Sequence, residues 1–262
     1  MALNIFLVVL SIYLIITVFL YLYQRNFLYH PNINSKSAYE LNHKVDKIII
    51  QSDNKLVAWY HKKNKNLKTL VFFHGNAGNL SNRIYKLNEF SKMNLNYLIF
   101  AYRGFNGNNG KPTEEGLYKD ANSVIDWLKS NDILENQIIL YGESLGTAIS
   151  VNIAQDKEFA GIILEAPFTS MIEMGKKYYP IFPVKYLLKD KYETIKKIKN
   201  LRSPILIMHG KKDKIVPFSM GKKIYNLSNN PKFKYFNDYD DHMMEYNSDL
   251  TNSINTFINN LN

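Results

Sequence analysis

The stretch QIILYGESLGTAISVNIA, residues 137–154, joins a run of β-type residues to a helical run through a glycine turn. The turn, GESLG at 142–146, matches the pattern G-x-S-x-G, which in a strand–turn–helix setting is typical of a nucleophile elbow. We expect Gly142 and Gly146 to let the strand and helix approach closely and to place the Ser144 hydroxyl at the helix N-terminus. Free N–H groups there favour developing negative charge. The alternative is a serine that only caps the helix.

An activated serine needs a general base, and the base needs an acid that orients it. In folds that carry this turn, the chain order is serine, acid, histidine. Of the six histidines, only His242 follows the last predicted strand, and Asp213 lies in the loop after the strand before it. Asp238, Asp240 and Asp241 lie too close to His242 in sequence to reach its far nitrogen easily. We predict His242 as the base and Asp213 as the acid, against the alternative that His242 is an exposed loop histidine.

The tetrahedral intermediate of acyl transfer needs backbone N–H donors around its oxyanion. One donor is expected from Leu145, the residue after the predicted nucleophile. The other is expected from the loop HGNAGN after the third predicted strand, where small residues allow close backbone approach. Asn76 is our first choice for this second donor and Ala77 the alternative. His74 and His209 each precede a glycine at a strand end, so we expect both to be structural.

Around the glycine turn, apolar runs suited to strands alternate with stretches of helical periodicity. Such alternation favours a mostly parallel central sheet with crossover helices on both faces. The expected strands are 44–51, 55–61, 69–73, 97–101, 137–141, 161–165, 204–208 and 232–236. The expected helices are 82–93, 113–130, 144–155, 219–227 and 245–262. Residues 169–203 stand outside the alternation, and we expect them to form a short cap over the C-terminal edge of the sheet.

Residues 3–23 read LNIFLVVLSIYLIITVFLYLY and carry no charge. At about 1.5 Å per residue, this run matches the roughly 30 Å hydrocarbon core of a bilayer. A cleavable signal peptide is the alternative, but a basic n-region and an A-x-A site are missing. We predict a transmembrane anchor at 1–25, a linker at 26–42 and a catalytic domain at 43–262. Because the first basic residues, Arg25, Lys36, Lys44 and Lys47, flank the apolar run on its C-terminal side, the catalytic domain is expected on the cytoplasmic side.

The chain has 262 residues and no cysteine. This excludes disulfides, cysteine-ligated zinc, iron–sulfur clusters and a thiolate nucleophile. A serine–histidine–aspartate triad needs no metal or organic cofactor, and we expect none. The formal net charge of +10 permits an anionic partner. The basic residues are dispersed or lie in the expected cap, without a recognised nucleic-acid-binding module, so we expect a lipid bilayer as partner and no nucleic acid.

Seven short stretches between residues 72 and 244 follow one another in the order FFHGNAGN, AYRGFNG, EEGLYKDA, YGESLGTA, LEAPFTS, MHGKKDKIVP and DHMM. With them the chain resembles the membrane-anchored serine hydrolases of the α/β-hydrolase fold. It is similar to the branch with one N-terminal membrane helix, which includes acyl hydrolases and protein depalmitoylases. The resemblance implies an α/β-hydrolase fold with a short cap, and it implies Ser144, Asp213 and His242 as the catalytic triad.

The expected cap combines positive charge with aromatic and aliphatic residues. Residues 171–202 hold nine Lys or Arg and three Asp or Glu. Such a cap suits anionic headgroups and an acyl chain, and the alternative is a solvated cap that only packs on the sheet. We predict hydrolysis of a carboxylic ester or thioester of an apolar acyl group, on a lipid or a lipidated protein, through an acyl-enzyme on Ser144. The alternatives are a serine peptidase or aminopeptidase of the same fold and a non-catalytic membrane scaffold.

Overall fold

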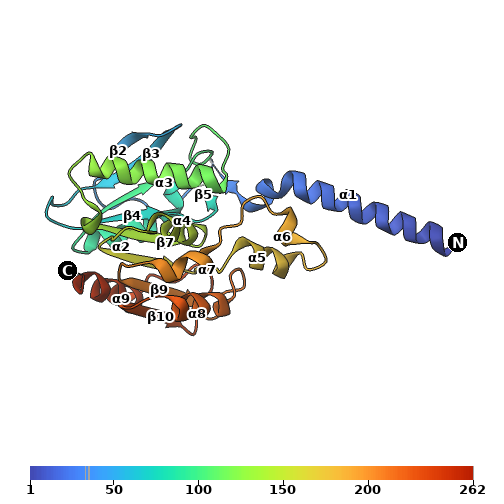
Figure 1. Cartoon of the computed structure of the whole chain (residues 1–262). Helices are drawn as coiled ribbons and strands as arrows, with labels where there is room; N and C mark the ends of the chain where they lie inside the picture. Colours follow the sequence, from blue (N-terminus) through green and yellow to red (C-terminus); the bar gives the residue numbers. More distant parts are fainter. Residues whose placement is uncertain (33, 35, 262) are drawn as a thin grey trace.

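A mostly parallel sheet forms the centre of the molecule in the computed structural model, which describes residues 1–32, 34 and 36–261 (Figure 1). Within these residues, eight strands lie in the order β10-β9-β8-β7-β4-β6-β3-β2. The pairs β2–β3 and β3–β6 are antiparallel, and the neighbours from β6 to β10 are parallel. The strands are β2 Asp46–Gln51, β3 Lys55–His61, β4 Thr69–Phe73, β6 Asn96–Phe100, β7 Ile138–Glu143, β8 Gly161–Glu165, β9 Ile205–Gly210 and β10 Lys232–Asn237.

Helices cover both faces of this sheet. The helices of the described residues are α1 Ala2–Leu28, α2 Ile84–Lys92, α3 Glu114–Lys129, α4 Leu145–Ile153, α5 Met171–Tyr178, α6 Val184–Leu187, α7 Thr194–Lys197, α8 Phe218–Leu227 and α9 Ser248–Asn259. Helices α3, α4, α7 and α8 contact one another in a row, while α2 contacts β6 and α9 contacts β10. The α/β-hydrolase architecture expected from the sequence is confirmed.

The first helix is long and apolar enough to cross a membrane, and most of its apolar side chains are exposed. Its N-terminal part extends away from the sheet, as Figure 1 shows. It continues to Leu28, three residues past the predicted end of the anchor at residue 25. Tyr29, which follows it, is buried, and the short strand β1, His30–Pro31, pairs with β5, Ala77–Gly78. The first residues of the predicted linker therefore pack on the catalytic body.

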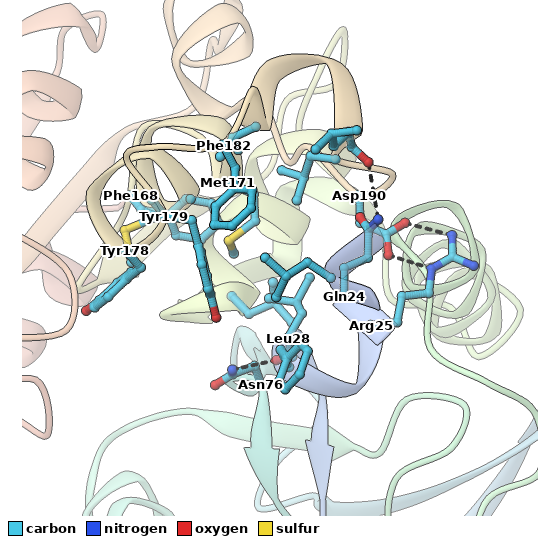
Figure 2. A pocket seen from close by; sticks show the side chains of 18 of the residues that line it. Gln24, Arg25, Leu28, Asn76, Phe168, Met171, Tyr178, Tyr179, Phe182 and Asp190 are labelled. Carbon is cyan, nitrogen blue, oxygen red and sulfur yellow. Dashed lines mark hydrogen bonds and ion pairs between the residues drawn. The ribbon is translucent and has the colours of Figure 1, made fainter. Parts of the chain in front are cut away.

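One face of α1 rests against the cap. Its partly buried residues recur three or four positions apart, which is the spacing of one helix face. They include Tyr13, Thr17, Leu20, Gln24 and Leu28. The cap itself contains α5, α6, α7 and the 3-10 turn Ile198–Asn200. Near its C-terminal end α1 is joined to the cap by an ion pair, drawn as dashed lines in Figure 2, between the Arg25 guanidinium and the Asp190 carboxylate at 2.8 Å.

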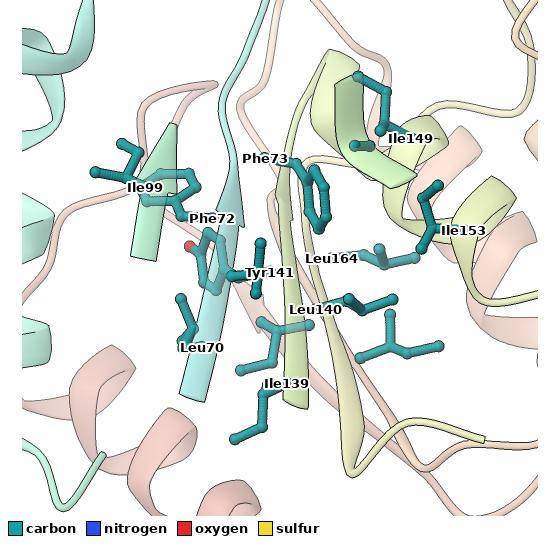
Figure 3. Packing of buried hydrophobic residues seen from close by; sticks show 14 of the residues in the cluster. Leu70, Phe72, Phe73, Ile99, Ile139, Leu140, Tyr141, Ile149, Ile153 and Leu164 are labelled. Atoms are coloured by element: carbon teal, nitrogen blue, oxygen red, sulfur yellow. The ribbon is translucent and has the colours of Figure 1, made fainter. Parts of the chain in front are cut away.

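Buried strands form the core on both sides of the sheet (Figure 3). Neighbouring residues of a strand point to opposite faces. On β4, Phe72 contacts Phe90 of α2, with ring centroids 6.0 Å apart. Phe73 points to the opposite face, and a Cβ on Gly146 of α4 would overlap its carbonyl oxygen. This close packing fixes where the turn between β7 and α4 lies.

Candidate active site

The turn between β7 and α4 holds Ser144 in a strained conformation. Ser144 has φ +50° and ψ −111°, a region that residues with a side chain rarely adopt. A Cβ on Gly142 would lie 2.6 Å from the carbonyl oxygen of Gly146, so neither glycine tolerates a side chain without movement. The Ser144 N–H donates to the Glu165 carbonyl oxygen at 2.9 Å, which ties the turn to β8. The structure thus forms the tight turn that the G-x-S-x-G spacing predicts.

The three residues predicted as a triad form one hydrogen-bonded chain. The Ser144 hydroxyl oxygen lies 3.1 Å from Nε2 of His242. Nδ1 of the same imidazole lies 2.7 Å from Oδ2 of Asp213. The residues come from three elements: the β7–α4 turn, the loop after β9 and the loop after β10. These loops meet because the carboxyl ends of parallel strands lie at one edge of the sheet.

The Asp213 carboxylate is surrounded by hydrogen-bond donors. Its Oδ1 accepts the backbone N–H groups of Ile215 and Val216, each at 2.8 Å. Burial alone would raise the pKa of Asp213, but hydrogen bonds from His209 and His242 outweigh it and hold the pKa well below its ordinary value. His209 is fully buried, and its Nε2 lies 3.0 Å from the Val216 carbonyl oxygen. Asp213 is therefore ionised at neutral pH and oriented toward His242.

The loop at 74–79 carries the predicted second oxyanion donor, Asn76, which lines the same cavity as Ser144 and Leu145. Asn76 is fixed by the end of α1. Its side-chain amide donates to the Leu28 carbonyl oxygen at 2.7 Å, and its own carbonyl oxygen accepts from the His30 N–H at 2.8 Å. These contacts were not foreseen from the sequence.

The other side of that loop is held by a buried charged network. Glu143 accepts from the Gly75 N–H at 3.1 Å and from the Arg83 guanidinium at 2.6 Å. Arg83 also donates to the Ala77 carbonyl oxygen at 2.7 Å. The Lys86 ammonium lies 2.6 Å from Glu143 and 2.7 Å from Glu165. Because Glu143 directly precedes Ser144, the network joins the nucleophile turn to the predicted oxyanion loop.

Charge pairing explains why these groups remain ionised although they are buried. Burial alone would raise the pKa of Glu143, but Arg83 and Lys86 hold it well below the ordinary value. Burial alone would lower the pKa of Lys86, yet the two carboxylates raise it. A sequence signal was present in retrospect, because a glutamate stands inside the glycine turn and two basic residues lie three apart at the start of a helix. Their pairing could not be read from it.

His74 has the environment of a structural residue. It is buried, its Nδ1 contacts the Gly75 carbonyl oxygen at 2.7 Å, and its ring lies 4.3 Å from that of Tyr102. Burial, with a smaller contribution from Arg83, lowers the pKa of His74 to about 3. The imidazole is therefore neutral at physiological pH and is not hydrogen-bonded to Ser144.

A cavity of about 460 Å³ opens beside Ser144. Figure 2 shows it between Met171, Tyr179 and Phe182 of the cap and Leu28 of α1, with Asn76 at its lower side. Its lining is mostly apolar, and its charged members, Arg25 and Asp190, are paired with each other. In the described part of the chain, no group of three or more His, Cys, Asp or Glu is arranged to hold a metal ion.

The sheet, the strained serine turn and the histidine and aspartate from later loops define an α/β hydrolase. A profile of the prolyl oligopeptidase family matches residues 102–245, and one of the Chlamydia CHLPS protein family matches residues 5–162. The chain belongs to the prolyl oligopeptidase family of α/β hydrolases. It is therefore a hydrolase.

Relatives and solved structures agree with this assignment. An uncharacterised protein of Mycobacterium tuberculosis is 31% identical over 83% of this chain and 79% of its own length. The lysophosphatidylserine lipase ABHD12 of Mus musculus is 30% identical over 73% of this chain and 53% of that protein, so the chain spans about half its length. The solved esterase Pf2001 of Pyrococcus furiosus superposes with a TM-score of 0.71 at 17% identity, over 88% of this chain and 99% of that one. At this identity the likeness shows the fold.

Proposed function

We propose that the protein is a serine hydrolase that cleaves carboxylic esters or thioesters of apolar acyl groups on a lipid or a lipidated protein. The observation that carries the proposal is the Ser144–His242–Asp213 chain of hydrogen bonds at the edge of a mostly apolar cavity. The name of the lipase relative supports an ester substrate. No metal or organic cofactor takes part in the proposed reaction.

In the proposed mechanism, His242 Nε2 removes the proton of the Ser144 hydroxyl as its oxygen attacks the acyl carbonyl carbon. The bond to the alcohol or thiol breaks, and His242 returns the proton to that leaving group. Water then attacks the acyl-enzyme, with His242 again taking a proton and giving it back to Ser144 as the acid is released. Asp213 stays ionised and stabilises the imidazolium.

The oxyanion of each tetrahedral intermediate is proposed to lie between the N–H groups of Leu145 and Asn76. Leu145 is the first residue of α4, so its N–H is at the helix terminus, where negative charge is favoured. Asn76 is held on the facing loop by Leu28 and His30. Fixed donors of this kind stabilise developing charge without reorganising during the reaction.

The cavity favours an acyl substrate over a peptide with a free amino terminus. An aminopeptidase needs an unpaired carboxylate to hold the substrate ammonium. Among the described residues that line the cavity, the acidic side chain is Asp190, and it is engaged by Arg25, Tyr29 and the Glu114 N–H. A non-catalytic scaffold would have no physical need for the strained Ser144 turn.

We also propose that α1 anchors the enzyme in a membrane. Its apolar run is exposed and long enough for the roughly 30 Å hydrocarbon core. Arg25, Lys36, Lys44 and Lys47 follow the run, and positive charge favours the cytoplasmic side of a membrane. The catalytic domain is therefore assigned to the cytoplasmic side, which protease accessibility in sealed vesicles tests.

A fluorophosphonate probe tests the proposed nucleophile in the full chain. The wild-type protein should be labelled and Ser144→Ala should not. Ser150→Ala is a matched control, because Ser150 lies in the adjacent helix α4 and its hydroxyl is buried without a hydrogen-bond partner. p-Nitrophenyl esters from C2 to C16, compared with aminoacyl anilides, then test the substrate. Labelling that persists in Ser144→Ala, or a preference for anilides, would refute the proposal.

A further inference from the structure

The segment of the cap at 179–183, which we call the cap tip, lies against the middle of α1. The Tyr13 hydroxyl donates to the Ile181 carbonyl oxygen at 3.1 Å, and the Tyr13 ring stacks on Phe182 with centroids 5.3 Å apart. A second contact lies closer to the body, where the Lys189 ammonium is 4.2 Å from the Tyr21 ring centroid. The cap therefore follows α1 for the eight residues between these two tyrosines, about 12 Å along the helix axis.

Because the cap contacts α1 at both Tyr13 and Tyr21, a membrane that holds α1 also sets the depth of the cap tip. The mostly apolar run of α1 carries no charge up to Tyr23, and the first charged residue is Arg25. A lipid boundary nearer the N-terminus than Tyr21 would leave exposed apolar residues at the end of the run, such as Leu22 and Tyr23, in water. A boundary at Tyr21 or beyond places the cap tip, level with Tyr13, inside the hydrocarbon.

The side chains and backbone of the cap tip suit that position. Ile181 is 72% exposed, a large apolar side chain with no protein cover. Irregular backbone at membrane depth requires internal partners for its polar groups. Pro180 and Pro183 carry no N–H, the Phe182 N–H donates to the Tyr179 carbonyl oxygen, and the Ile181 carbonyl oxygen is bonded to Tyr13.

Charges near the cap tip lie at the level of the proposed membrane surface. Lys189 contacts Tyr21, and Arg25 pairs with Asp190 at the C-terminal end of α1. Lys185 lies two residues before Leu187, whose carbonyl oxygen accepts from Gln24. Long basic side chains at this level reach the headgroups while their stems stay in apolar surroundings. The charged and apolar parts of this surface are thus separated along the axis of α1.

The mouth of the active-site cavity lies on the same surface. Among the residues that line the cavity, Tyr21 and Phe27 of α1 and Tyr178 and Tyr179 of the cap are also exposed. These aromatic side chains therefore border the opening. Because they come from α1 and from the cap, the opening lies between the two elements that would meet the membrane.

We propose that the cap tip is embedded in the bilayer beside α1, so that the cavity opens to the acyl-chain region and receives its substrate directly from the membrane. The inference rests on the proposed membrane anchor and on the proposed acyl substrate. Its partner is the lipid bilayer, because the exposed apolar surface of the cap tip is continuous with that of α1. Acyl chains then reach Ser144 without crossing water.

The absence of cysteine from the sequence allows a direct test in the full chain. A nitroxide label on Ile181→Cys, in protein reconstituted into vesicles of phosphatidylcholine and phosphatidylglycerol, should collide several-fold more with oxygen than with a water-soluble nickel chelate. Ile15→Cys on α1, 68% exposed, should behave in the same way. Leu134→Cys, 54% exposed before β7, is the matched control and should prefer the nickel chelate.

The labels distinguish the possible failures. A label at Ile181 that behaves like the one at Leu134 overturns the inference. Shielding of the Ile181 label from both reagents indicates a covering protein and also overturns it. An aqueous label at Ile15 removes the anchor on which the inference rests.

Kinetics give an independent measurement. Ile181→Asp should raise KM at least fivefold for a long-chain ester presented in vesicles and leave kcat/KM for a short soluble ester unchanged. Leu134→Asp should change neither. Equal KM values of the two variants for the long-chain ester in vesicles would contradict a cavity that opens into the bilayer. If the wild-type protein hydrolyses no ester, the proposed function fails, while the label positions still decide whether the cap tip is embedded.

Discussion

The loop at 74–79 is held from two sides, and the two sides differ in burial and in origin. On the inner side, Glu143 and Arg83 bind Gly75 and Ala77 inside the core. On the outer side, Leu28 and His30, at the end of α1, bind Asn76. Adjacent residues of one loop thus depend on a desolvated charge network and on a helix assigned to the membrane.

We expect the inner contacts to act mainly on the stability of the fold and the outer contacts mainly on the position of the loop. Removing one partner of a buried ion pair leaves an uncompensated charge, so the inner side should dominate stability. Half-exposed contacts are screened by solvent, so the outer side should contribute little to stability. It can still adjust the position of the predicted oxyanion donor. The changes below test this contrast, from the largest expected effect to the smallest.

Glu143→Gln should lower the free energy of unfolding by about 3–5 kcal/mol, because Arg83 loses its carboxylate partner and Lys86 keeps only Glu165. Urea unfolding of the full chain in detergent measures this. Glu135→Gln is the matched control, since Glu135 pairs with Lys129 at the surface, and its effect should stay below about 1 kcal/mol. Equal losses in the free energy of unfolding for the two variants would contradict a dominant contribution of the inner side to stability.

The stability of the folded chain should also depend on acid through Glu143. Its folded-state pKa is held well below the ordinary value, so this stabilisation is present above the unfolded pKa and is lost as the pH falls. Below about pH 4.3 the unfolded chain binds a proton that folded Glu143 does not, which contributes about 1.4 kcal/mol per pH unit. Unfolding measured between about pH 5 and pH 3 should therefore have a shallower slope in Glu143→Gln. Identical slopes would count against an ionised buried Glu143.

Asn76→Ala should reduce kcat about tenfold with little change in KM, which corresponds to about 1.4 kcal/mol in the transition state. The change keeps the backbone N–H but removes the hydrogen bond to Leu28 that fixes the loop. Steady-state hydrolysis of a short ester measures it. Asn122→Ala, which removes a bond from a side chain on α3 to Tyr118, is the control. An unchanged kcat would show that the outer contact does not position the loop.

Arg25→Ala should change the free energy of unfolding by less than about 1 kcal/mol. The Arg25 side chain is 42% exposed, and Asp190 keeps the Tyr29 hydroxyl and the Glu114 N–H as donors. Urea unfolding compared directly with Glu143→Gln measures how much the docking of the end of α1, which carries the outer contacts, adds to stability relative to the inner network. A loss as large as that of Glu143→Gln would show that the docking of α1 on the cap is as important for stability as the inner network.

Much of the fold could be predicted because its signals are local. Alternating apolar runs marked the strands of the sheet, and the glycine spacing marked the turn at Ser144. The short strands β1 and β5 were missed, since two-residue strands have no periodicity to detect. The anchor was predicted to end at residue 25, just after the charge-free run, while the helix itself continues to Leu28.

The order of the chain also pointed to Ser144, Asp213 and His242, because each follows a strand whose carboxyl end reaches the same edge of the sheet. Their roles in catalysis stay predictions. The sequence alone therefore determined the elements, the glycine turn and the candidates for the site. The tertiary structure decided the pairing of Glu143 with Arg83 and Lys86 and the docking of α1 on the cap. With 33 basic and 23 acidic residues, charge permits very many pairs, and packing between distant segments selects among them.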